Sequence, residues 1–157
     1  MKNVYILYKP IPMFMLDITS SNHVMLEVVQ VNNTGNPIQD LDFFRTLPNG
    51  SREPSAFRVP LGQAFVITDV DWQYNNGTGG GIQTLRIFIG GTDGPPPDPG
   101  FRVFESTIML NGQGSGGISE DMTTGCMVGQ GGRIRVDSFP GGGVISHILV
   151  RGYLIPA

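Results

Sequence analysis

The chain has 157 residues, which is the length of one ordinary domain. Val, Ile and Thr number 13, 14 and 10, whereas Ala, Glu and Lys, which commonly cover helix surfaces, number only 3, 4 and 2, so a helical protein is nearly excluded. Ten basic and 13 acidic residues give a net charge of −3 without a basic run, which argues against a nucleic-acid partner, and no apolar stretch is long enough for membrane insertion.

Short apolar runs separated by turns follow one another along the chain, as the 23 Gly and 12 Pro would suggest. Prolines interrupt the first run, so residues 1–20 are expected to be an extended N-terminal segment or an edge strand. Later strands are expected at residues 23–31, 41–47, 57–59, 64–72, 82–89, 101–110, 125–128, 133–139 and 144–155. The pattern predicts one domain over residues 1–157. Its fold class is all-β, a jelly-roll-like antiparallel β-sandwich of about 8 to 10 strands.

The glycine-rich stretches between these runs are interpreted as loops and turns. Residues 75–81 are expected to form a flexible loop, and the proline-rich residues 90–100 are expected to cross the surface. Residues 112–117 and 129–132 lack the following helix and lysine of a phosphate-binding loop, so both are interpreted as turns.

Residues 57–67 and residues 126–136 share the frame V-x-x-G-x-x-(F/I)-x-(I/V). In each segment, a short strand is expected to meet a glycine-containing turn and then a longer strand. A sandwich that uses the same corner twice would place the two segments at equivalent positions.

The closing strand is long and ends in Arg151-Gly152-Tyr153-Leu154-Ile155-Pro156. The number of strands, the glycine corners and this long closing strand together resemble a jelly-roll β-sandwich. At the level of the fold, residues 20–157 resemble the heads of the tumour-necrosis-factor and C1q-like superfamily. This resemblance implies a homotrimer with apolar side chains at its axis.

Few residues of the types that carry catalysis are present. The single cysteine, Cys126, excludes a disulfide within the chain and is expected to be a small buried hydrophobic residue rather than a nucleophile. The histidines, His23 and His147, do not form the H-x-H pair typical of a cupin-type metal centre. We therefore expect no catalytic residues, and a cupin-like or carboxylate enzyme is kept only as a third hypothesis.

Asp69 and Asp71 stand two residues apart in one expected strand, on the face opposite Val66 and Trp72. Two such carboxylates could bind Ca²⁺ together with loop oxygens, or act as the acid and base of a glycosidase. Two aspartates on the solvent face of a sheet are also common without any function. No other cofactor is expected, and residues 120–121 are expected in a polar loop.

The best candidate for a ligand site follows the strongest expected strand. A sugar is bound by an aromatic plate together with carboxylate, carboxamide and backbone groups. This chemistry predicts a site of Trp72, Tyr74, Asn75, Asn76 and Asp71. The alternative interpretation is that Trp72 belongs to the core, as a lone tryptophan in a β-sandwich usually does.

The leading functional hypothesis is a non-catalytic structural or surface-recognition module that self-assembles as a homo-oligomer. Its residues 4–18 are expected to pair with a neighbouring subunit's sheet edge. The second hypothesis is a lectin-like module that binds a glycan. We expect a soluble chain without a classical signal peptide, because Lys9 and Pro10 end the first apolar run early. A location at the surface of a virion, a spore or a cell stays open.

Overall fold

The computed structural model describes residues 23–32, 43–90 and 101–157, which form strands and turns without a helix among them. The strands are β1 (His23–Asn32), β2 (Phe44–Thr46), β3 (Arg52–Ala56), β4 (Gln63–Asn75), β5 (Ile82–Gly90), β6 (Phe101–Met109), β7 (Gly116–Val128), β8 (Arg133–Phe139) and β9 (Val144–Pro156). The expected N-terminal segment, residues 1–20, and nearly all of the proline-rich loop lie outside the described residues.

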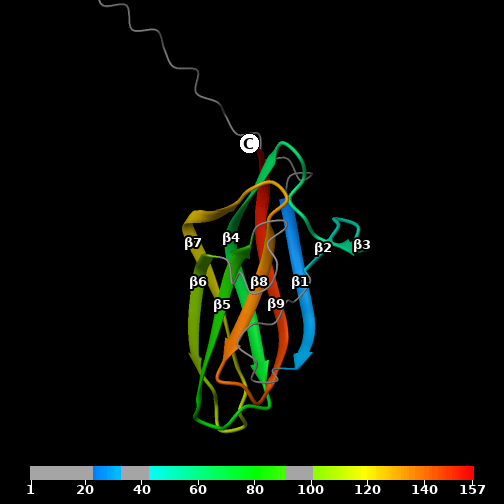
Figure 1. The fold of residues 1–157 in the computed structure, drawn as a ribbon. Helices are drawn as coiled ribbons and strands as arrows, with labels where there is room; N and C mark the ends of the chain where they lie inside the picture. Colours follow the sequence, from blue (N-terminus) through cyan, green and yellow to red (C-terminus); the bar gives the residue numbers. More distant parts are fainter. Residues whose placement is uncertain (1–22, 33–42, 91–100) are drawn as a thin grey trace, which may run out of the picture.

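The strands form two antiparallel sheets that pack as a sandwich (Figure 1). The larger sheet has six strands in the order β3-β2-β1-β9-β4-β7, and the smaller sheet has three in the order β6-β5-β8. From β4 onward the chain passes to the other sheet at every connection except that between β5 and β6. This crossing pattern is that of a jelly roll, so the predicted fold class is confirmed for the described residues.

The core lies between the two sheets and is built from alternate residues of the central strands. β4 contributes Ile67, then Val70 and Trp72, all of which are fully buried. The buried positions change from odd to even numbers because the pairing register shifts between Ile67 and Asp69. Val66 therefore faces the side opposite Val70 and Trp72, whereas strict alternation would have placed all three on one face.

The two segments with the shared sequence frame form equivalent turns at one end of the sandwich. In residues 60–63 and in residues 129–132, the N–H of the fourth residue donates to the carbonyl of the first. Gly62 and Gly131 occupy the third position of these turns, and each has a φ of +70°, which favours glycine. The Gly131 N–H also donates to the Val59 carbonyl at 2.9 Å. The repeated turn and the strand that follows it are therefore confirmed, although residues 57–59 before the first turn are not a strand.

At the opposite end of the sandwich, the turns at residues 75–81 and 110–115 pack against each other. The Gly77 N–H donates to the Gly114 carbonyl at 2.9 Å. We expected a flexible loop at residues 75–81, whereas the structure has a turn that a backbone hydrogen bond connects to a partner distant in sequence. A local sequence pattern does not reveal such a partner.

Two edge regions differ from the expected strands. Residues 57–59 are not a strand, and the edge of the larger sheet is instead the preceding, mostly exposed β3. β7 begins at Gly116, so residues 116–117 are not a turn, and residues 120–121 lie in this strand rather than in a loop. Because an edge strand has solvent along one side and most of β7 is exposed, the period-two signal is absent there.

Candidate functional site

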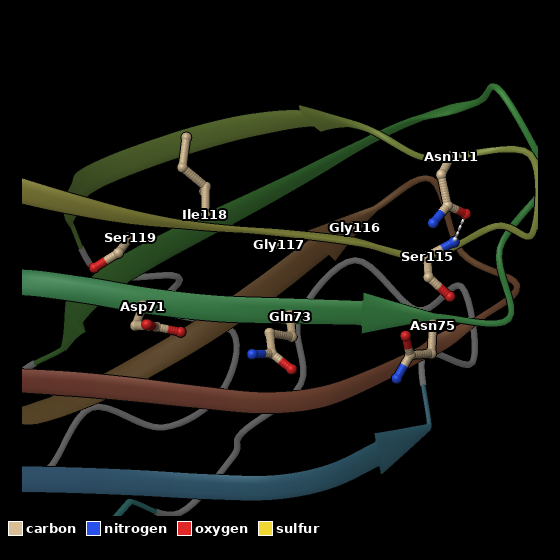
Figure 2. Close-up of a pocket in the computed structure, with 9 residues that line it drawn as sticks. All are labelled: Asp71, Gln73, Asn75, Asn111, Ser115, Gly116, Gly117, Ile118 and Ser119. Atoms are coloured by element: carbon tan, nitrogen blue, oxygen red, sulfur yellow. Dashed lines mark hydrogen bonds between the residues drawn. The ribbon is translucent and has the colours of Figure 1, made fainter.

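The described residues contain a polar hollow of about 460 Å³ on the outer face of the larger sheet (Figure 2). It lies where β4 and β7 approach the turn at residues 110–115. The residues that line it are Asp71, Gln73, Asn75, Asn111, Ser115, Gly116, Gly117, Ile118 and Ser119. One carboxylate among carboxamides and hydroxyls suits a neutral, hydroxyl-rich ligand better than a phosphate.

The alternation of β4 places Asp71, Gln73 and Asn75 on the outer face, because Trp72 and Tyr74 between them point into the core. Figure 2 shows the three side chains on one side of β4. Within the described part of the chain, Asp71 has no hydrogen-bond or ion-pair partner. Its carboxylate is therefore available to a ligand.

Glycine in β7 keeps the hollow open. Gly117 lies opposite Gln73 in the pairing of β4 with β7. A Cβ at Gly117 would lie 2.9 Å from the carbonyl oxygen of Trp72 and 3.0 Å from Cγ of Gln73. A side chain at this position would therefore collide with β4 and occupy the space beside Gln73.

The turn that closes the hollow is held by one of its own carboxamides. Asn111 Oδ1 accepts hydrogen bonds from the N–H groups of Gln113 and Ser115, at 2.9 and 3.0 Å. Figure 2 shows the one from Ser115 as a dashed line. An asparagine that caps its own turn in this way fixes the local backbone. Asn111 therefore shapes the wall of the hollow, and its NH2 group faces no partner in that turn.

Trp72 and Tyr74 are core residues, with 0% and 1% of their surface exposed. The Trp72 Nε1–H donates to the Ser106 hydroxyl at 3.0 Å, and this hydroxyl donates to the Glu120 carboxylate at 2.7 Å. Neither aromatic ring presents a face to a ligand. The prediction that Trp72 and Tyr74 form the aromatic part of a sugar site is therefore wrong, and both are core residues. The reason is that successive residues of a strand point to opposite faces, and Asp71 is the one that points outward.

The remaining predicted site residues are separated from one another. Asn75 lines the hollow, whereas the exposed Asn76 does not and occupies the turn with a φ of +58°. Asp69 accepts a hydrogen bond from Arg151 Nη1 at 2.5 Å, so its charge is already balanced. The Ca²⁺ candidates thus comprise one paired carboxylate, Asp69, and one unpaired carboxylate, Asp71. Within the described ranges, no group of three or more His, Cys, Asp and Glu side chains could hold a metal ion.

The histidines and the cysteine do not come together. His23 pairs with Tyr153 at one end of the larger sheet, and His147 pairs with Gln73 toward the other end. Cys126 is half-buried against the core, and burial raises the pKa of its thiol. A raised pKa lowers the thiolate fraction, which agrees with the expectation that Cys126 is a packing residue rather than a nucleophile.

The sequence interpretation missed a row of charges across the outer face of the smaller sheet. Glu105 accepts hydrogen bonds from Arg86 and Arg102, both at 2.8 Å, and Arg86 lies 3.8 Å from Asp137. The hydrogen bond from Arg86 is the main cause that holds the pKa of Glu105 below its usual range, whereas burial raises the pKa of Asp137. The alternation of β5 indicated that Arg86 faces outward, but its partners lie on two other strands.

No protein-family model, no curated protein and no solved structure matches this chain significantly. Of the expected resemblance to tumour-necrosis-factor and C1q-like heads, the structure shows a two-sheet antiparallel sandwich, and no match to that superfamily was found. Among the residues that the structure describes, there is no helix of the length and apolar character needed to span a membrane.

Proposed function

We propose that this protein is a non-catalytic structural module that assembles with copies of itself through the surface of its β-sandwich. One observation carries the proposal, a group of large apolar side chains on the outer face of the smaller sheet. Ile82, Met109 and Phe139 are 57%, 75% and 59% exposed. They share one end of this sheet, because Ile82 pairs with Met109, and Phe139 pairs with Thr84, two residues further along β5.

These three side chains are not needed to complete the core. The interior already contains buried residues from both sheets, with Leu85 and Ile87 of β5 fully buried on its other face. Apolar side chains gathered on one outer face are typical of a contact with another protein, since burying them removes apolar surface from water. The fold-level resemblance to tumour-necrosis-factor and C1q-like heads supports self-assembly.

The mass of the purified protein in solution tests this function. Size-exclusion chromatography with light scattering at micromolar concentration is expected to give a multiple of the 16.9 kDa chain mass. A strict monomer would overturn the proposal. Deleting residues 1–20 tests whether pairing of the N-terminal segment with a neighbouring sheet edge contributes, and an unchanged mass would remove that route of assembly.

Glycan binding is a second candidate function, favoured by the unpaired Asp71 carboxylate in the polar hollow. The Asp71 carboxylate can accept hydrogen bonds from the hydroxyls of a sugar ring, and the carboxamides of Gln73 and Asn75 beside it can both donate and accept them. The hollow lacks an aromatic plate, so such a site would depend on polar contacts and would bind a single glycan weakly.

A glycan array with the wild-type protein and two aspartate variants tests the second candidate. Asp71→Ala is expected to lower binding by at least about tenfold, because a hydrogen bond to a charged group contributes about 1.5–3 kcal/mol. Asp121→Ala is the matched control, since Asp121 is an exposed β7 residue that does not line the hollow. Absence of wild-type binding, with and without a chelator, would count against a glycan ligand.

A further inference from the structure

On the outer face of the smaller sheet, side chains that lie opposite each other on β5 and β6 are chemically complementary: one pair is apolar, one is a pair of hydroxyls and one is an ion pair. The pairs, from the apolar end inward, are Ile82 with Met109, Thr84 with Thr107, and Arg86 with Glu105. The two threonine hydroxyls are hydrogen-bonded at 3.0 Å, and the guanidinium donates to the carboxylate at 2.8 Å. The residues between them, such as Leu85 and Ser106, are buried, so all six matched side chains face outward.

This order of side chains makes the face complementary to itself. A two-fold axis in the plane of contact, running along the strands midway between β5 and β6, would place β5 of one copy over β6 of the other. Each cross-strand row would then face the same row of the other copy, with isoleucine over methionine, threonine over threonine and arginine over glutamate. An axis across the strands would instead place apolar rows over charged rows, which desolvates the charges without pairing them.

We infer that a second copy of this chain occupies the outer face of β5 and β6, related to the first by the two-fold axis along these strands. The inference rests on the proposed function of self-assembly and names its surface and symmetry. Burial of Ile82 and Met109, which lie on the two strands nearest the axis, supplies the favourable free energy. The row of Arg86 and Glu105 supplies the specificity, because a two-fold axis centred on β5 would place Arg86 over Arg86 and one centred on β6 would place Glu105 over Glu105.

A lysine substitution at the apolar end tests the surface. Met109→Lys changes a side chain that is 75% exposed, so the fold should tolerate it, and thermal unfolding checks this. It is expected to weaken association by at least about tenfold, measured as the dimer dissociation constant by sedimentation. Met127→Lys is the matched control, because Met127 is 63% exposed on β7 of the other sheet, and association should be unchanged.

A pair of charge reversals tests the position of the axis. Arg86→Glu would place carboxylate over carboxylate across the axis, and Glu105→Arg would place guanidinium over guanidinium, so each variant alone is expected to be monomeric. A mixture of the two variants restores one cation over one anion at both contacts. The mixture is therefore expected to associate when neither variant does.

The outcomes separate the inference from the proposed function. A monomeric wild type overturns self-assembly itself. An oligomer that Met109→Lys does not weaken, an oligomer of three copies, or a mixture of the reversed variants that stays monomeric overturns the two-fold contact while self-assembly stands. An even number of copies, sensitivity to Met109→Lys but not to Met127→Lys, and recovery in the mixture establish the contact.

Discussion

Replacing Trp72 by alanine is expected to lower the free energy of unfolding by about 3–5 kcal/mol, which is the usual cost of removing a large aromatic side chain from a core. Trp72 is among the largest fully buried side chains of the described chain. Its indole also donates to Ser106, which in turn donates to Glu120, so the substitution would disconnect a buried polar chain between the two sheets. Urea unfolding followed by circular dichroism measures the loss.

Trp72→Phe separates packing from hydrogen bonding at the same position. Phenylalanine keeps most of the apolar volume but has no N–H to donate to Ser106, so the expected loss is smaller, about 1–3 kcal/mol. An alanine variant no less stable than the phenylalanine variant would contradict the view that packing dominates. A ligand role for Trp72 would predict the reverse pattern, with binding lost and stability kept.

Replacing Gly114 by alanine is expected to lower the free energy of unfolding by about 2–5 kcal/mol. Gly114 has a φ of +75°, in the left-handed region where an L residue costs about 1–2 kcal/mol. A Cβ there would also overlap the carbonyl oxygen of Gly77, forcing apart the two turns that close the sandwich. Crowding of this kind adds about 1–3 kcal/mol.

Gly112→Ala is the matched control for this turn. Gly112 lies two residues away, and a Cβ at this position would have no atom within 4 Å. Its replacement should therefore change the midpoint of thermal unfolding by little. Equal destabilisation by the two alanine variants would show that the turn does not depend on the close approach of Gly114 to Gly77.

Several strands could be predicted closely because their signals are local. The expected strand at residues 133–139 coincides with β8, and the expected strand at residues 82–89 differs from β5 by one residue. Both alternate in hydrophobicity between clear turn residues. β7 was largely missed, because its glycines and exposed polar residues are acceptable at a sheet edge but carry no period.

The candidate site could be predicted only in part. Asp71 and Asn75 do line a polar hollow, but Trp72 and Tyr74 do not contribute to it. Alternation shows which residues share a face of a strand, but it does not show which face meets the other sheet. The wall that Asn111 supports comes from a turn distant in sequence, so no motif near Asp71 could indicate it.

By itself, the sequence determined the all-β class, the limits of β1, β5, β8 and β9 to within one residue, and the two corner turns with Gly62 and Gly131. These features depend on composition, on a period of two and on turn chemistry, all of which act between near neighbours in the chain. Only the tertiary structure decided that Asp69 is neutralised by Arg151 while Asp71 stays unpaired. Such partners lie on other strands, and they are selected by pairing register and by the bulge in β4, which no local pattern specifies.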